Sequence, residues 1–161
     1  GAEGEAGGPA ELVGGGRSVI AGTHTAVARA EEAWAARKGR FSRLATSGGF
    51  HSPLMASAAE PFAAYLAGVD FRESAVPVIG NVQAAPLTAD GARAELVAHL
   101  TSPVQFEASV AKLQAAGAQM FAEVGFGGVL ANLVKRIDRA APRAAIQDRA
   151  SFDAFVAENG E

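Results

Sequence analysis

Hydrophobic positions along the chain recur at two spacings, which predict strands and helices in alternation. Short apolar and β-branched runs predict strands over 18–21, 41–46, 76–82, 119–124 and 144–147. Apolar residues at helical spacing predict helices from Thr23 or Thr25 to about Lys38, and over 53–66, 89–100, 103–116, 129–137 and 151–158. This order indicates an α/β fold with a mainly parallel sheet.

Prolines mark how two of these helices begin. Pro53 fits the first turn of its helix, whereas Pro61 inside the same helix should kink or divide it. Ser102 predicts a helix N-cap, because Pro103 follows at the first helical position and Gln105 stands in capping-box register. The helix over 53–66 would bury one apolar stripe, formed by Leu54, Ala58, Phe62 and Leu66.

Composition narrows the class of protein. The 161 residues are 49% hydrophobic and 19% charged, which is typical of a globular domain or a large part of one, while residues 1–16 are rich in Gly, Ala and Glu and predict a flexible lead-in. A net charge of −3 gives no reason to expect nucleic acid or a membrane surface as partner. The absence of cysteine excludes disulfides, zinc thiolates and a cysteine nucleophile. Without an apolar run of membrane-spanning length or a signal peptide, we expect a cytoplasmic protein.

The candidate chemistry centres on His51, in the segment 47–55. It follows a glycine-rich turn and precedes a predicted helix, where a loop can expose an imidazole on a rigid scaffold. A lone histidine is more often structural than catalytic, so the interpretation depends on the residues around it.

These surroundings resemble the histidine motif of the malonyl-CoA:acyl carrier protein transacylases and of the related polyketide synthase acyltransferase domains. The resemblance covers roughly residues 17–150, in the order and spacing of that family. An ordered set of motifs is more specific than a single one. The further similar segments are 18–22 with 26–27, 78–82 with Ala84 and Pro86, Leu100 with 103–106, and 123–127 with 129–130 and 135–137.

The resemblance implies an α/β-hydrolase-like large subdomain into which a ferredoxin-like small subdomain is inserted. Residues 17–46 would be the end of the small subdomain, and residues 47–161 the C-terminal part of the large one. Two segments depart from the family pattern: 13–17 replaces Asn-Ser-Pro-Gly-Gln, and Phe126 replaces the proline of Glu-Val-Gly-Pro-Gly.

The chemistry that the resemblance implies is transfer of a malonyl group from malonyl-CoA, through an acyl-serine, to the phosphopantetheine thiol of acyl carrier protein. His51 would be the general base, oriented by the main-chain carbonyl of His99, where the family usually has glutamine. Phe50 and Ser52 would bind substrate, with the Phe50 ring favouring malonyl over methylmalonyl. The expected partner is therefore acyl carrier protein, and no bound cofactor or metal is expected.

A nucleophile is not evident in the chain, because no Gly-x-Ser-x-Gly occurs. A general base needs a hydroxyl within hydrogen-bond reach, so the resemblance implies that a missing N-terminal acyltransferase half would supply the serine. The isolated chain should then have little transferase activity. The alternative is a non-catalytic module that docks carrier protein or scaffolds a synthase complex.

Two further groups leave alternatives open. The glycines at 125–128 could cradle an anion ahead of a helix, although tight strand-to-helix packing explains them better. Lys135, Arg136 and Arg139 could attract an acidic carrier protein, and a favourable charge at a helix C-terminus explains them equally well.

Overall fold

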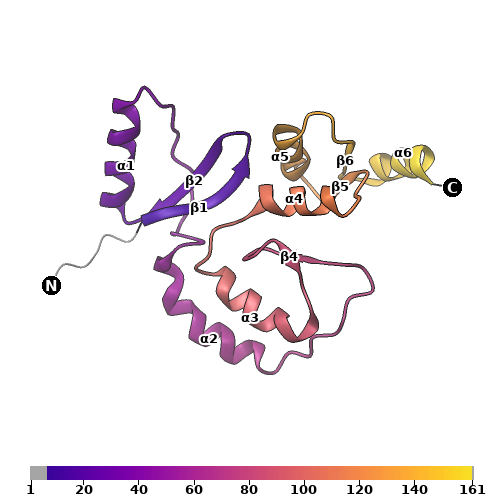
Figure 1. Ribbon diagram of the computed structural model, residues 1–161, viewed down its shortest axis with the longest axis horizontal. Helices are drawn as coiled ribbons and strands as arrows, with labels where there is room; N and C mark the ends of the chain where they lie inside the picture. The colour runs from indigo at the N-terminus through magenta and orange to yellow at the C-terminus, as the bar shows by residue number, and fades with distance from the viewer. Residues whose placement is uncertain (1–6, 161) are drawn as a thin grey trace.

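The computed structural model describes residues 7–160, except for the side chain of Val13. Helices and strands are mixed along the whole chain, which confirms the α/β content (Figure 1). The elements in order are β1 (Gly7–Gly14), β2 (Arg17–Gly22), α1 (His24–Ala36), the 3₁₀ turn η1 (Pro53–Met55), α2 (Ala56–Leu66), β3 (Ile79–Gly80), β4 (Ala85–Pro86), α3 (Ala89–His99), α4 (Phe106–Ala115), β5 (Phe121–Val124), α5 (Val129–Ile137), β6 (Arg143–Ile146) and α6 (Arg149–Asn159).

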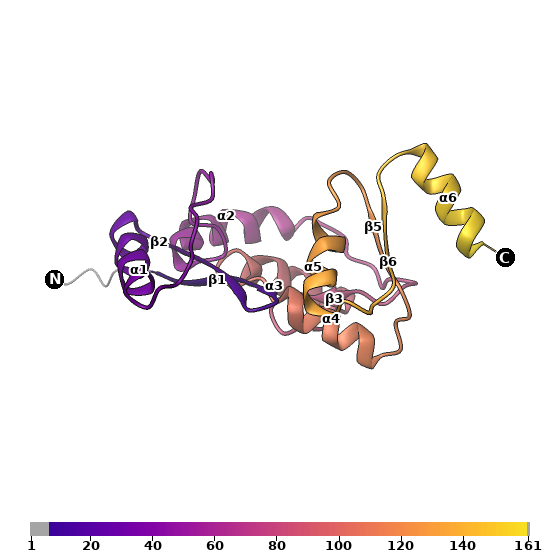
Figure 2. The ribbon, with the colours of Figure 1, turned by 90° about the horizontal axis from the view of Figure 1, so that it is seen from above.

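The elements form three groups. The β1–β2 hairpin carries α1, α2 lies beside α3 with the β3–β4 hairpin, and α4 and α5 pack with β5 and β6. Figures 1 and 2 both show α6 projecting away from the rest of the chain at its C-terminal end.

The prediction of a mainly parallel sheet is wrong for the described residues. Among the three two-stranded sheets of the described residues, only that of β5 and β6 is parallel, from Phe121 opposite Arg143 to Val124 opposite Ile146, and α5 supplies the crossover that this arrangement needs. A single parallel bridge also joins Glu11 of β1 to Val104. The other two sheets are antiparallel pairs. Gly15 and Gly16 turn the chain directly from β1 into β2 with positive φ angles, and such a tight turn can only join antiparallel strands.

The flexible lead-in predicted over residues 1–16 is also wrong from residue 7 onward, and residues 1–6 lie outside the described part. Ala10 is buried, and the main chain of β1 bonds to Val104: the Leu12 N–H donates to the Val104 carbonyl, and the Val104 N–H to the Ala10 carbonyl, both over 2.7 Å. The composition predicted a flexible lead-in, but residues 7–14 pair with β2 and bond to Val104.

The β1–β2 turn makes a prediction about two neighbouring glycines. A Cβ added at Gly14 would clash with Cγ1 of Ile137, and φ there is +84°. Gly16 has a similar φ of +72° but open space around it. We expect Gly14→Ala to lower the free energy of unfolding by about 2–5 kcal/mol, from strain plus overpacking, and the control Gly16→Ala by about 1–2 kcal/mol from strain alone. Urea unfolding of both variants checks this, and equal losses would contradict the clash.

Two predicted strands are absent or shortened. Residues 41–46 form no strand; Phe41 and Leu44 are more than half exposed, and no described main-chain group pairs with this segment. The strand predicted over 76–82 is reduced to Ile79–Gly80. Strand propensity gives a stable strand only where a neighbouring strand completes the hydrogen bonds.

Two helix details also differ from the prediction. Helix α4 begins at Phe106 with Gln105 as its N-cap and has no side-chain capping bond, while the Ser102 hydroxyl donates to the Ala98 carbonyl over 2.7 Å. Pro61 does not divide α2, which runs without interruption through it. A proline removes only one helical hydrogen bond, and the packing of Leu66 at the far end of α2 is retained.

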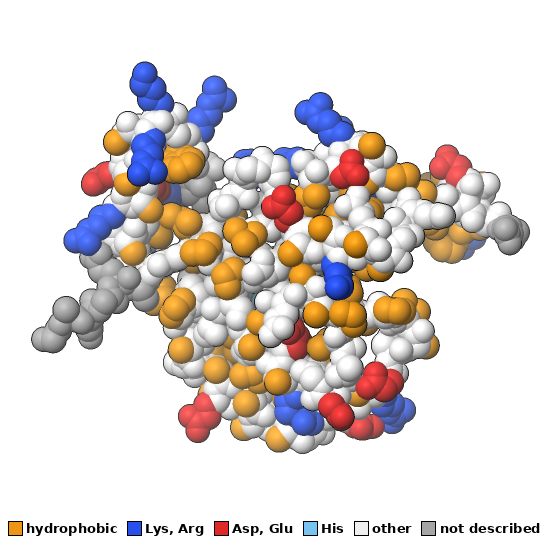
Figure 3. All heavy atoms as spheres, viewed as in Figure 1, with side chains coloured by type: hydrophobic (Ala, Val, Ile, Leu, Met, Phe, Trp, Pro, Cys, Tyr) orange, Lys and Arg blue, Asp and Glu red, His pale blue; other side chains and the backbone are white. Residues whose placement is uncertain are grey.

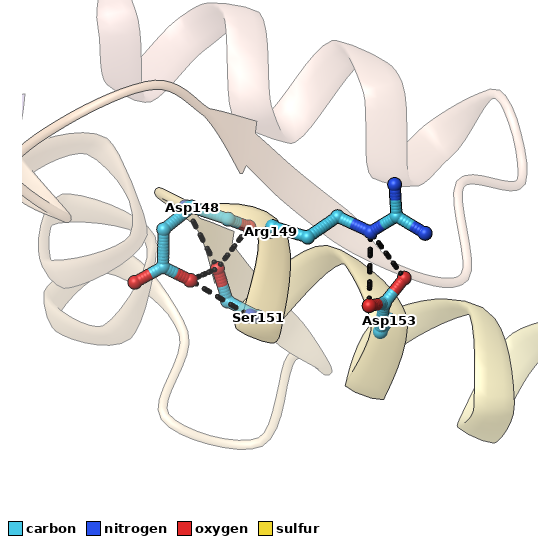
Figure 4. Close-up of polar contacts among 4 residues, drawn as sticks. All are labelled: Asp148, Arg149, Ser151 and Asp153. Carbon is cyan, nitrogen blue, oxygen red and sulfur yellow. Dashed lines mark hydrogen bonds and ion pairs between the residues drawn. The ribbon is translucent and has the colours of Figure 1, made fainter.

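The start of α6 is fixed by a capping box (Figure 4). The Asp148 carboxylate accepts from the Ser151 N–H, and the Ser151 hydroxyl in turn accepts from the Asp148 N–H. Two hydrogen bonds to its carboxylate lower the pKa of Asp148 below its ordinary value. The bond from the Ser151 N–H has the larger effect, and the bond from the Ser151 hydroxyl adds to it. Arg149 pairs with Asp153 one turn later.

The buried core is small for the length of the chain. Val110, Val134 and Ala141 form its centre, with Phe106, Phe121 and Ile137 packed against them. The exposed surface is 11197 Å², about one and a half times the roughly 7,500 Å² expected for a compact monomer of 16.3 kDa. Apolar side chains are scattered over the face shown in Figure 3. The chain therefore leaves much apolar surface without a cover of its own.

Candidate functional site

His51 stands at a constrained point of the chain, between the glycine turn and η1. Its φ of +57° lies in the left-handed region, which a residue with a Cβ rarely adopts. Such strain persists only where the surroundings hold it, and it is concentrated at functional sites.

Ser52 supplies that support. It is 2% exposed, its hydroxyl donates to the Gly49 carbonyl over 2.5 Å, and the same oxygen accepts from the Leu54 N–H over 3.3 Å. It therefore caps η1 and closes the loop around His51. These bonds give Ser52 a structural role, and its predicted contact with substrate stays a prediction.

The His51 ring faces the end of α3. Its Nδ1 atom lies 3.2 Å from the main-chain carbonyl oxygen of His99. Because a carbonyl only accepts, this contact is a hydrogen bond when Nδ1 carries the hydrogen, which leaves Nε2 with a lone pair. The last carbonyls of a helix lack intrahelical partners, and His99 ends α3, so its carbonyl is available to accept from the His51 ring. The structure thus brings together the two residues that the family resemblance paired.

The two histidine side chains also touch. Their rings are stacked with centroids 4.8 Å apart and planes 27° apart. The His99 Nε2 atom is buried and has no hydrogen-bond partner among the described groups. Burial, and then the nearby charge of His51, lower the pKa of His99 below its ordinary value, against an opposing effect of Glu95. Sequence reasoning gave His99 only a backbone role and missed this ring contact.

Asn81 and Glu95, which the sequence analysis also missed, tie the end of α3 to its neighbours. The Asn81 side chain donates to the Pro103 carbonyl over 2.9 Å and accepts from the Gln105 N–H over 2.7 Å. The Glu95 carboxylate accepts from the Val82 N–H over 2.7 Å. The bonds of Asn81 fix the segment between α3 and α4, directly after His99. The available signal was a short polar residue at the end of a predicted strand.

Phe50, next to His51, is half exposed, and its ring lies beside Gly48. The structure leaves this ring open to solvent on the same loop as the imidazole. Its role in substrate binding stays a prediction.

The glycine turn at 125–128 is organised for packing. The Glu123 carboxylate accepts from the Ala131 N–H over 2.9 Å and so satisfies one free donor at the start of α5. Gly128 takes the left-handed conformation at the N-cap, and the Gln147 side chain accepts from the Gly127 N–H. These bonds favour strand-to-helix packing over an anion cradle. Phe126 is 91% exposed within this turn.

Within the described residues, no three His, Asp or Glu side chains are grouped so that they could hold a metal ion. Nor is any helix of residues 7–160 both long and apolar enough to cross a membrane.

Comparison with known proteins gives the chain its relatives, although no family model matches it. It is 40% identical over 144 residues to the malonyl CoA-acyl carrier protein transacylase of Bacillus subtilis, a match that covers 88% of this chain and 45% of that protein. Its fold matches the transacylase FabD of Xanthomonas oryzae with a TM-score of 0.91 and 33% identity, over 96% of this chain and 50% of that one. It also matches a malonyl-transacylase solved in complex with a type II polyketide acyl-carrier protein, with a TM-score of 0.92 and 34% identity, over 98% and 52% of the two chains.

These likenesses define the chain as an acyltransferase fold of mixed α/β content. The family is that of the malonyl-CoA:acyl carrier protein transacylases, and the chain corresponds to the C-terminal part of its members. It spans about half the length of these relatives.

Proposed function

We propose that this chain is the general-base part of an acyltransferase that moves a malonyl group from malonyl-CoA to the phosphopantetheine thiol of acyl carrier protein. The observation that carries the proposal is the hydrogen-bond distance between Nδ1 of His51 and the His99 carbonyl. This contact leaves Nε2 as the atom that accepts a proton. The sequence relationship to the transacylases supplies the reaction.

The reaction needs a serine from outside residues 1–161. With that serine, every proton that His51 accepts is passed on to a leaving group. Nε2 of His51 takes the serine proton while the serine oxygen attacks the malonyl thioester, and the departing CoA sulfur takes that proton. In the second half, Nε2 takes the proton of the phosphopantetheine thiol, and its sulfur attacks the acyl-serine. The serine oxygen leaves and recovers the proton. The His99 carbonyl stabilises each imidazolium.

The exposed surface supports a complementary part that covers this chain. Four apolar side chains lie exposed in and after β5, here called the apolar edge cluster: Val124, Phe126, Val129 and Leu130. Beside them, β5 pairs with β6 alone among the described strands, so its other edge has free main-chain groups. We assign this edge to the part that carries the serine, with residues 17–46 ending a ferredoxin-like subdomain and residues 47–161 completing the large one.

Two features relate to the substrates. The Phe50 ring would fill the space that an α-methyl group needs, and a pocket distinguishes one such methyl by about 1–3 kcal/mol. The carrier protein is inferred from the relative that was solved in complex with one. Lys135 and Arg136 at the end of α5 offer it positive charge.

The test is intact-mass spectrometry after incubation with malonyl-CoA. The samples are the chain alone, the N-terminal part of the Bacillus subtilis transacylase alone, and a mixture whose association has been measured. We expect a malonyl adduct on the Bacillus part in the mixture, and its loss when holo acyl carrier protein is added. An associated mixture that forms no adduct would contradict the proposal and favour a non-catalytic module, for which the lack of a nucleophile elbow in the chain is the supporting observation.

A further inference from the structure

His99 contacts His51 through two different groups. Its main-chain carbonyl lies at Nδ1 of His51, and its imidazole ring lies over the His51 ring with centroids 4.8 Å apart. The carbonyl contact can be made by any residue at the end of α3. The ring contact requires a flat side chain at this one position.

The surroundings of the His99 ring disfavour its charged form. Its Nε2 atom is buried without a hydrogen-bond partner among the described groups, and a charge there would have no compensation at that atom. Burial lowers the pKa of His99 most, the charge of His51 lowers it further, and only Glu95 on the same helix acts in the opposite direction. At neutral pH the ring is therefore a flat, neutral surface beside His51.

We propose that the side chain of His99 is a positioning residue for His51, restraining the plane of the His51 ring so that Nδ1 stays on the His99 carbonyl. A rotation of the His51 ring about its Cβ–Cγ bond would take Nδ1 away from the carbonyl, and the stacked ring opposes that rotation. Because the His99 ring is neutral, it also places no like charge beside the imidazolium that forms when His51 accepts a proton. The consequence for catalysis rests on the proposed function, whereas the positioning itself does not.

The first test is nitrogen-detected NMR of the chain on its own, which reports the tautomer of each histidine. We expect the wild type to hold His51 in the Nδ1–H tautomer and His99→Phe, which keeps a flat ring, to do the same. The variant His99→Ala keeps the carbonyl but not the ring, and we expect it to populate both tautomers. An unchanged tautomer in His99→Ala, or its loss in a folded His99→Phe, would overturn the proposal.

A second measurement needs no change at position 99. NMR titration of the wild type should place the pKa of His99 below its ordinary value, and His51→Ala should raise it, because both the nearby charge and part of the burial are removed. A His99 pKa raised well above its ordinary value would mean a charged ring near neutral pH and would contradict the proposal.

Kinetics separate this proposal from the proposed function. In the associated mixture, we expect His99→Ala to reduce kcat by roughly ten- to a hundredfold with little change in KM, since misplacement of a reacting group has effects of this order. His99→Phe should restore most of the rate. If the NMR results for the wild type are as expected but no malonyl transfer occurs, the proposed function is refuted, whereas the positioning of His51 by the His99 ring stands. Malonyl transfer that is equal in wild type and His99→Ala would refute the positioning alone.

Discussion

Replacing His51 with alanine is expected to reduce malonyl transfer in the associated mixture by roughly 10²- to 10⁴-fold, the usual contribution of a positioned general base. No other imidazole in the described residues lies both on an open loop and on a carbonyl acceptor. His99 cannot substitute, because its Nε2 atom is buried. The rate of appearance of malonyl carrier protein, followed by mass spectrometry, measures the loss.

His24→Ala is the matched control for this experiment. His24 is exposed at the start of α1, far along the chain from the His51 loop, so its loss should leave the rate unchanged. Circular dichroism of both variants confirms that each remains folded. A His51→Ala variant that is folded, associated and still as active as the control would show that the base lies elsewhere.

Much of the fold was predictable because its signals are local. Thr23 caps α1, Gly117 follows α4 with a positive φ, and Val129 begins α5 after the glycine turn, all near the predicted positions. The errors concern partners that lie far along the chain. The segment 41–46 has strand-forming residues but no neighbour to pair with, and residues 7–14 become a strand because β2 and Val104 bond to them.

The candidate site shows the same difference between local features, which could be predicted, and contacts between distant residues, which could not. The loop around His51 and the carbonyl of His99 were expected from the motifs, since the family pattern names both positions. The stacking of the two rings was not, because it joins residues 48 positions apart and depends on side-chain conformation. The hydrogen bonds of Asn81 to the segment after His99 were missed for the same reason.

The second large effect is expected at the apolar edge cluster. Val124 is 80% exposed at the end of β5, where the proposed complementary part would bury it. Burial of one valine contributes about 1.5–3 kcal/mol, and a lysine at this position would also have to lose hydration from its charge. We therefore expect Val124→Lys to weaken association with the N-terminal part of the Bacillus transacylase by at least about tenfold, as measured by analytical ultracentrifugation.

Tyr65→Lys is the control for charge alone. Tyr65 is similarly exposed, at 74% on α2, but it lies outside the apolar edge cluster. If both variants weaken association equally, added charge rather than the cluster is responsible. If neither does, the complementary part binds another face.

The His51 and Val124 variants report on separate properties. His51→Ala should slow transfer although the two parts still associate, whereas Val124→Lys should lose transfer only to the extent that it loses association. Raising the concentration of the Bacillus part should restore the rate for Val124→Lys and leave that of His51→Ala low, which distinguishes a binding surface from a chemical group.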